Sequence, residues 1–257
     1  MERNKITTVI WDCDKTLWNH DPYNEEMFID ELGIDKKELS EFKAQFFFLI
    51  SKFNTYFITH KVSYDKTCLL IEEYMPILSK YNKSGKDFLD IFINKPNHIL
   101  NPGAFDAMKY TFDSGYRNII LSDWFLKSQE RHLKKFQLFD FVENIFTCDD
   151  SYLKANPKIA SKIVSHPSET IMIGDSLRAD IAFANQAGIN SIWYNPAKLV
   201  NDSKYAPTYT ITSLFEVMDI LYFKTECFKW HSSSFYFFFI YFILYSYIWI
   251  DSIFNNF

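Results

Sequence analysis

The chain has 257 residues, of which 48% are hydrophobic and 23% charged, and this composition excludes a chain that is disordered as a whole. Its formal net charge of -5, with both signs mixed along the sequence, argues against a nucleic-acid-binding protein, because such proteins carry a basic surface that neutralises phosphates. The four cysteines, Cys13, Cys68, Cys148 and Cys227, form no CxxC pair, so we interpret them as reduced thiols of a cytoplasmic protein.

The first predicted strand, residues 6–11, leads directly into two carboxylates that lie one residue apart, Asp12 and Asp14, in the sequence VIWDCDKTLW. Negative charges at the end of a buried strand destabilise a fold unless a partner neutralises them. Cys13 lies between the two acids, whose charge should raise the pKa of its thiol and suppress the thiolate. We therefore expect the chemistry of this segment to come from its carboxylates.

The segment from residue 23 to residue 97 has apolar positions at helical spacing and no convincing strand, as in KKELSEFKAQFFFLISKF. We interpret it as an inserted α-helical cap domain of roughly four helices. Aromatic residues such as Phe46, Phe47 and Phe48 are expected in the core of this bundle. Inserted domains of this kind can move as rigid bodies over a cleft.

Beyond the insert, short strands alternate with helices. Strands are predicted at residues 118–121, 143–147, 170–173 and 191–194, and helices at residues 103–114, 126–136, 157–164 and 178–187. This alternation predicts an α/β fold: a Rossmann-like, doubly wound parallel sheet with helices on both faces. We expect the core domain to comprise residues 1–22 and 98–222, and the cap residues 23–97.

The C-terminal residues 223–257 form an aromatic-rich tail outside the predicted core. Within it, Phe235 to Ile250 reads FYFFFIYFILYSYIWI without a charge. As a helix this run would be about 24 Å long, shorter than the roughly 30 Å of a bilayer core. Three interpretations stay open: a contact with a membrane, a hydrophobic contact in an oligomer, and an appendage outside the fold.

Polar side chains follow four of the predicted strands. They are Asp12 and Asp14 after the first, Ser122 and Asp123 after the second, Lys154 after the third, and Gly174-Asp175-Ser176 after the fourth. Because the carboxyl ends of parallel strands share one edge of a sheet, these groups should meet there. Acids gathered in one place repel each other, so the cluster requires a cation. Oxygen ligands without His or Cys indicate Mg²⁺, and Mg²⁺ with a lysine and a hydroxyl suits phosphoryl chemistry.

Four motifs in this order resemble those of the haloacid dehalogenase superfamily. They are DxDxT (Asp12, Asp14, Thr16), a serine that closes the second core strand (Ser122), a lysine before a helix begun by proline (Lys154 in KANPKIA) and GDSxxxD (Gly174 to Asp180). The resemblance covers roughly residues 6–221. The insert is similar to the helical cap of the subfamily that includes phosphoglycolate phosphatases. The run GDSLRADIAFANQAGINSIWYNP is particularly similar to pyrimidine 5′-nucleotidases.

The resemblance implies a role for each acid. Asp12 would be the nucleophile that forms an aspartyl-phosphate, and Asp14 would act as general acid and then general base. Asp12 and Asp175 would bind Mg²⁺ through their side chains and Asp14 through its backbone carbonyl, while Asp180 would support the metal.

The resemblance further implies that Thr16, Ser122 and Lys154 contact or position the phosphoryl oxygens of the substrate. The sequence departs from the family pattern after the lysine, because Ala155 stands where proline is usual, and Lys158 lies one helical turn further on.

Each of these residues also has a simpler structural interpretation. Ser122 or Asp123 could be the N-cap of the helix that follows, and Asp175 or Ser176 could cap the helix that begins near Leu177. Taken one at a time, such residues are common at helix ends. The ordered set of motifs is what favours a site.

The resemblance implies a Mg²⁺-dependent phosphatase of a small phosphorylated metabolite, with a nucleoside monophosphate as one candidate. Asp14 favours hydrolysis of a phosphate ester over dehalogenation, because an alcohol leaving group needs a proton and a halide does not. Two alternatives stay open: a phosphotransferase or mutase on the same fold, and a non-catalytic scaffold whose tail binds a membrane or a partner. We expect no nucleic-acid partner.

Overall fold

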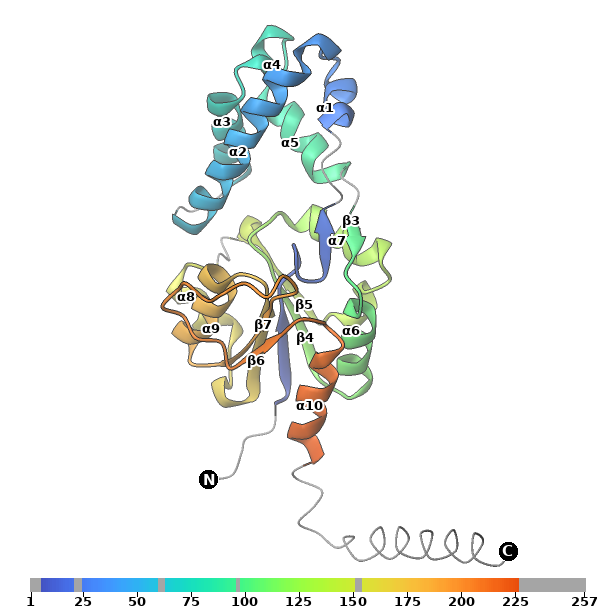
Figure 1. Cartoon of the computed structure of the whole chain (residues 1–257), viewed down its shortest axis with the longest axis vertical. Coiled ribbons are helices and arrows are strands. Elements are labelled where there is room, and N and C mark those ends of the chain that lie inside the picture. The colour runs from blue at the N-terminus through green and yellow to red at the C-terminus, as the bar shows by residue number, and fades with distance from the viewer. Residues whose placement is uncertain (1–5, 21–24, 60–62, 96–97, 151–153, 227–257) are drawn as a thin grey trace, which may run out of the picture. The chain divides into compact units, whose positions relative to one another are not determined.

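The computed structural model describes residues 6–20, 25–59, 63–95, 98–150 and 154–226. Within these residues lies a six-stranded sheet in the order β5-β4-β1-β6-β7-β8, with every neighbouring pair parallel (Figure 1). The strands are β1 (Thr8–Trp11), β4 (Arg117–Leu121), β5 (Asn144–Phe146), β6 (Thr170–Gly174), β7 (Asn190–Tyr194) and β8 (Tyr209–Ile211). The predicted α/β class with a parallel sheet is confirmed.

The two central strands, β1 and β6, are buried along their whole length, which explains why both read as unbroken apolar runs. One face of the sheet packs on the helices α8 (Pro157–Ile163) and α9 (Ala182–Ala187). The contact is a cluster of buried side chains that includes Ile10 and Met172 from the sheet and Ile159 and Phe183 from the helices. In Figure 1, α8 and α9 lie on one side of the strands and α6 (Ala104–Asp113) on the other.

A buried polar contact fixes α6 against the sheet. The Trp11 indole N–H donates to Asn118 Oδ1 at 2.9 Å, and the Thr111 hydroxyl donates to the same oxygen at 2.8 Å. Trp11 ends β1, Asn118 lies in β4, and Thr111 lies on α6. Because all three groups are buried and hydrogen-bonded, they fix the position of the helix without leaving a polar atom unsatisfied.

The helix α7 (Leu126–Lys135) begins without a cap from its own segment. Its first backbone N–H, that of Leu126, donates to Asp149 Oδ2 at 2.6 Å. The interpretation of Ser122 or Asp123 as the N-cap of this helix is therefore wrong, since Phe125 occupies the cap position and a residue beyond β5 supplies the acceptor. After β6, by contrast, Ser176 does act as an N-cap. Its side chain accepts the Ala179 backbone N–H at 3.2 Å, at the start of the helical turn that begins at Leu177.

Between β2 (Trp18–His20) and β3 (His98–Leu100), the described residues form five α-helices. They are α1 (Glu25–Leu32), α2 (Leu39–Thr59), α3 (Tyr64–Tyr74), α4 (Ile77–Lys80) and α5 (Gly85–Asn94). The helix α5 starts with a capping box, in which Ser84 and Asp87 satisfy each other's backbone N–H groups.

Phenylalanine rings form the core of this helical segment. Phe28 stacks on Phe88 with ring centroids 5.1 Å apart, and Phe46 packs against both rings. Phe46 is buried, but the prediction that Phe47 and Phe48 join the core is wrong, because they are 72% and 59% exposed. Successive helix residues point about 100° apart, so three consecutive rings cannot all face the core.

Two features of the strands were not predicted. The chain enters and leaves the helical segment through a two-stranded antiparallel ribbon, in which β2 pairs with β3 and Trp18 lies opposite Leu100. The strand β8 extends the parallel sheet beyond β7. The helix predicted at residues 178–187 also consists of two parts, a π-helical turn at Leu177–Ile181 followed by α9.

The chain divides into two compact units, Met1–Met218 and Asp219–Phe257, and the division falls within α10 (Glu216–Glu226). The predicted tail lies outside the described residues from position 227 onward. Among the helices that the structure describes, none combines the length and the apolar character needed to cross a membrane.

Candidate active site

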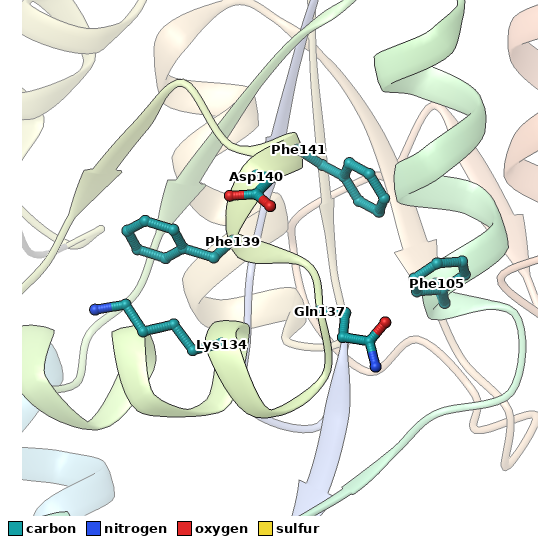
Figure 2. Close-up of a pocket in the computed structure, with 6 residues that line it drawn as sticks. All are labelled: Phe105, Lys134, Gln137, Phe139, Asp140 and Phe141. Atoms are coloured by element: carbon teal, nitrogen blue, oxygen red, sulfur yellow. The ribbon is translucent and has the colours of Figure 1, made fainter.

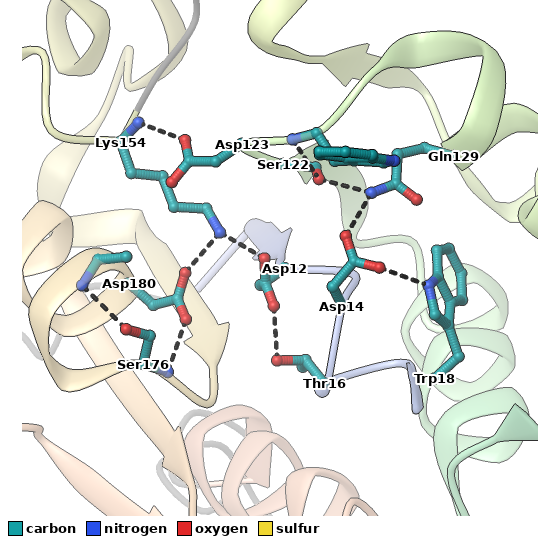
Figure 3. A network of polar contacts seen from close by, with 12 residues as sticks. Asp12, Asp14, Thr16, Trp18, Ser122, Asp123, Gln129, Lys154, Ser176 and Asp180 are labelled. Carbon is teal, nitrogen blue, oxygen red and sulfur yellow. Dashed lines mark hydrogen bonds and ion pairs between the residues drawn. The ribbon is translucent and has the colours of Figure 1, made fainter. Parts of the chain in front are cut away.

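Asp12 follows the last residue of β1, and neighbours hold both of its carboxylate oxygens. Thr16 donates its hydroxyl to Asp12 Oδ2 at 2.8 Å, and the Lys154 ammonium donates to Asp12 Oδ1 (Figure 3). The Asp12 side chain is only 7% exposed. Burial raises the pKa of Asp12, while the charge of Lys154 opposes this shift.

Lys154 contributes a buried ammonium, 4% exposed, between two carboxylates. Its Nζ lies 2.7 Å from Asp180 Oδ1 in addition to its contact with Asp12. Burial alone would lower the pKa of Lys154, but the charges of Asp12, Asp180 and Asp123 together raise it well above its ordinary value. Asp123 also accepts the Lys154 backbone N–H at 2.9 Å. Lys158, one turn further on, is exposed, so the structure brings Lys154 and not Lys158 to the carboxylates.

Three carboxylates gather at this point. One oxygen from each of Asp12, Asp175 and Asp180 lies within 4.8 Å of the others. Asp175 directly follows β6, the parallel neighbour of β1, so adjacent strand ends bring these acids together. Burial, reinforced by the charge of Asp12, raises the pKa of Asp175 to about 7. Burial likewise raises the pKa of Asp180 well above its usual range.

The turn after β6 is built around Asp180. Asp180 Oδ2 accepts the Ser176 backbone N–H at 2.9 Å, so the carboxylate folds back over the start of the helical turn. Gly174 makes room for it, because a Cβ atom at this position would lie 2.2 Å from Asp180 Cγ. The spacing of the GDSxxxD motif therefore has a steric reason: the last acid rests against the glycine.

The carboxylate of Asp14 points away from Asp180 and the Asp12 carboxylate toward two donors (Figure 3). The Trp18 indole N–H donates to Asp14 Oδ1 at 3.2 Å, and the Gln129 side-chain amide donates to Asp14 Oδ2 at 2.7 Å. His98 Nε2 lies 3.9 Å from Asp14 Oδ1. Of the two acids in the DCD sequence, only Asp12 has its side chain in the acidic cluster. Cys13 lies between these two acids in the sequence. Burial, with a smaller effect from the charges of Asp12 and Asp14, raises the pKa of its thiol well above the ordinary value.

Ser122 follows β4 and is 1% exposed. Its Oγ accepts the Trp124 backbone N–H at 3.2 Å and the Gln129 side-chain amide at 2.7 Å. Gln129 therefore links Ser122, which follows β4, to Asp14, which lies beyond the end of β1.

Sequence reasoning missed Gln129 and Trp18. A signal for Gln129 exists in the chain, because a polar residue on the buried face of a helix requires partners. The buried positions of α7 are Ser128, Gln129, His132 and Leu133, so polar side chains dominate the face that the helix buries. The contact of Trp18 with Asp14 depends on the β2–β3 ribbon, which the sequence did not reveal.

A separate hollow of about 400 Å³ is lined by residues that include none of the predicted site residues (Figure 2). The lining consists of Phe105, Lys134, Gln137, Phe139, Asp140 and Phe141. Lys134 Nζ lies 4.7 Å from the centre of the Phe139 ring. The hollow offers one carboxylate and no hydroxyl, so it lacks the donor set that phosphoryl chemistry needs.

The residues at the strand ends fit a hard divalent cation. Asp12, Asp175 and Asp180 present three carboxylates, which outnumber the buried ammonium of Lys154. Burial is the main cause of the raised pKa of Asp175, and the charge of Asp12 adds to it. Oxygen ligands of this kind suit Mg²⁺ or a cation of similar hardness.

A family model of haloacid dehalogenase-like hydrolases matches residues 6–188, which include every predicted site residue. The chain belongs to the haloacid dehalogenase-like hydrolase family. The acids after β1 and β6, the serine after β4 and the lysine before α8 all lie within the matched residues.

Named relatives of this hydrolase include phosphatases. It is 48% identical over 65 residues to the pyrimidine 5′-nucleotidase PynA of Streptococcus pneumoniae, a match that covers 25% of this chain and 27% of that protein. It is 29% identical over 128 residues to the glyceraldehyde 3-phosphate phosphatase of Pyrococcus furiosus, covering 47% of this chain and 53% of that one. These sequence matches therefore span about a quarter and about half of the relatives' own length.

The magnesium-bound structure of the HAD-hydrolase YfnB from Bacillus subtilis has the same fold. The two structures superpose with a TM-score of 0.65 at 23% sequence identity, covering 85% of this chain and 100% of that chain.

Proposed function

We propose that this hydrolase is a Mg²⁺-dependent phosphatase that acts on a small phosphomonoester through an aspartyl-phosphate on Asp12. The observation that carries the proposal is the gathering of the Asp12, Asp175 and Asp180 carboxylates around the Lys154 ammonium at the ends of β1 and β6. Membership of the family and the names of the phosphatase relatives support it.

In this proposal Asp12 and Asp175 hold the cation through their side chains, the backbone carbonyl of Asp14 completes the protein's share of the ligands, and Asp180 supports the group. When bound, Mg²⁺ supplies positive charge that neutralises the phosphoryl oxygens of the substrate. Thr16, Ser122 and Lys154 contact or position those oxygens.

The first half-reaction transfers the phosphoryl group to Asp12. A carboxylate oxygen of Asp12 forms a bond to phosphorus while the ester P–O bond breaks. Thr16 and Lys154 fix the orientation of Asp12 for this attack. Asp14, as the general acid, gives a proton to the oxygen of the departing alcohol.

The second half-reaction restores the enzyme. Asp14, now a carboxylate, accepts a proton from a water molecule whose oxygen attacks phosphorus. The bond between phosphorus and Asp12 breaks, and inorganic phosphate leaves.

For the substrate we propose a nucleoside monophosphate. The support is the stretch of 65 residues that is 48% identical to a pyrimidine 5′-nucleotidase. The similarity to a glyceraldehyde 3-phosphate phosphatase makes a small sugar or triose phosphate the comparison substrate.

The test is release of inorganic phosphate from nucleoside monophosphates, triose phosphates and aryl phosphates, with Mg²⁺ and with chelator. Wild-type protein is expected to turn over at least one ester with Mg²⁺ and none with chelator. Asp12→Asn should lower kcat by roughly 10³-fold or more, because the amide is a poor nucleophile. The matched control is Asp113→Asn on the exposed surface of α6, which should retain full activity.

Two outcomes would contradict the proposal. A wild-type chain without turnover on the whole panel would favour a non-catalytic scaffold. An active chain that tolerates Asp12→Asn would exclude the aspartyl-phosphate mechanism. Repeating the assay with excess acceptor alcohol separates hydrolysis from phosphotransfer, since a transferase forms a new ester in place of inorganic phosphate.

A further inference from the structure

Gln129 is a buried polar residue for which fold stability gives no reason. It lies on α7 with a side chain that is 0% exposed. Its amide nitrogen makes two hydrogen bonds, but within the described part of the chain its Oε1 has no hydrogen-bond partner. A buried amide oxygen without a partner destabilises a fold, and an apolar side chain of similar size would avoid this cost.

The two hydrogen bonds of Gln129 both go to predicted site residues from different strands. Nε2 donates to Asp14 Oδ2 at 2.7 Å and to Ser122 Oγ at 2.7 Å (Figure 3). The orientation of the amide follows from charge, because the reverse orientation would place its oxygen against the Asp14 carboxylate. Both protons of the amide are therefore used at the site.

For Asp14, the contact fixes the direction of the carboxylate. Gln129 holds Oδ2 and Trp18 holds Oδ1, so each oxygen has its own donor. The Asp14 side chain is 27% exposed, and without these donors it could rotate toward solvent. A general acid must keep its proton within hydrogen-bond reach of the leaving oxygen, so a rotated carboxylate is less effective.

For Ser122, the same amide determines what the hydroxyl can do. A serine hydroxyl has two acceptor sites and one donor. The Trp124 backbone N–H and Gln129 Nε2 occupy the acceptor sites. The hydroxyl proton is thereby left to donate, which is the role that a phosphoryl oxygen requires.

We propose that Gln129 is a positioning residue, which aims Asp14 at the leaving-group oxygen and directs the Ser122 proton at the phosphoryl group. This inference rests on the proposed phosphatase function. The two roles of Gln129 should affect different substrates. Asp14 acts only on esters whose leaving group needs a proton, whereas Ser122 acts on the phosphoryl group that all esters share.

The test compares kcat/KM for 4-nitrophenyl phosphate, whose phenolate departs without a proton, with kcat/KM for the best alkyl phosphate of the panel. The readout is the ratio of the alkyl value to the aryl value. In Gln129→Met this ratio should fall at least about tenfold below that of the wild type. In Ser122→Ala both values should fall together and leave the ratio within about twofold of the wild type. Glu130→Gln, at the neighbouring position of α7, should change neither value.

Thermal melting followed by circular dichroism checks that each variant folds. If Gln129→Met fails to fold, Gln129→Glu keeps the shape of the side chain and replaces the donating amide by an acceptor, and the ratio should again fall. Equal losses on both esters would overturn the role of Gln129 in aiming Asp14, and no loss on either ester would overturn both of its roles, while the phosphatase proposal would stay intact. A wild-type chain that hydrolyses no ester would overturn both.

Discussion

At the scale of single residues, Gly174 shows how little space the acidic cluster leaves. The carboxylate of Asp180 lies against the backbone of Gly174. A Cβ atom added at residue 174 would lie only 2.2 Å from Asp180 Cγ. The same carboxylate accepts the Ser176 backbone N–H and contacts the Lys154 ammonium. A methyl group at Gly174 must therefore displace a side chain that is held from two other directions.

Gly174→Ala is expected to lower the free energy of unfolding by about 2 kcal/mol, a typical cost of forcing extra atoms into a packed interior. Chemical denaturation followed by circular dichroism measures this. The control is Gly115→Ala, where the space is open but φ is 79°, so only the backbone strain of about 1 kcal/mol applies. Equal stability of wild type and Gly174→Ala would show that Asp180 can move aside without cost.

The sequence could predict which residue types meet at the site, but only part of how they meet. Asp12, Lys154 and Asp175 follow strand ends in a parallel sheet, so their convergence follows from topology. The separation of Asp14 from the acidic cluster does not, because it depends on donors from Gln129 and Trp18. Those contacts come from side-chain packing between distant segments, which the spacing of residues along the chain does not encode.

At the scale of elements, α7 depends on a residue outside its own segment. The first N–H groups of a helix have no partner within the helix. For Leu126 the acceptor is Asp149, in the 3₁₀ turn Cys148–Asp150 after β5. Because α7 also contains Gln129, this contact connects the loop after β5 to a residue that contacts Asp14 and Ser122.

Asp149→Ala should lower the free energy of unfolding by about 1 kcal/mol, the usual cost of losing an N-cap acceptor. Asp149→Asn keeps a side-chain oxygen and should lose much less. Hydrogen exchange of the α7 amides should quicken in the alanine variant and stay near the wild-type rate in the asparagine variant. Unchanged exchange in both variants would mean that solvent replaces the acceptor without cost.

The order of strands and helices could be predicted where segments are long and regular. All five predicted strands correspond to β1, β4, β5, β6 and β7. The missing elements, β2, β3 and β8, have three residues each, too few to show an alternating pattern. The strand β5 is equally short, but it lies within the longer predicted run of residues 143–147. The ribbon of β2 and β3 also joins positions on either side of the helical segment, and only tertiary contacts select such a pairing.

At the scale of the whole molecule, the described structure unites segments that are distant in sequence at one edge of a parallel sheet. The strands β4, β1 and β6 are neighbours, so Ser122, Asp12 and Asp175 follow adjacent strand ends. The carboxylates of Asp12, Asp175 and Asp180 outnumber the buried ammonium of Lys154. The central claim is that this edge binds a divalent cation, which compensates the excess.

Isothermal titration calorimetry of Mg²⁺ into wild-type protein and Asp175→Asn tests that claim most directly. Removing one charged ligand should weaken the site, because carboxylate charge sets its affinity for hard cations. We expect saturable binding of one Mg²⁺ to the wild type and at least about tenfold weaker binding to the variant. Absence of binding to the wild type, or equal affinity of the two proteins, would contradict the account.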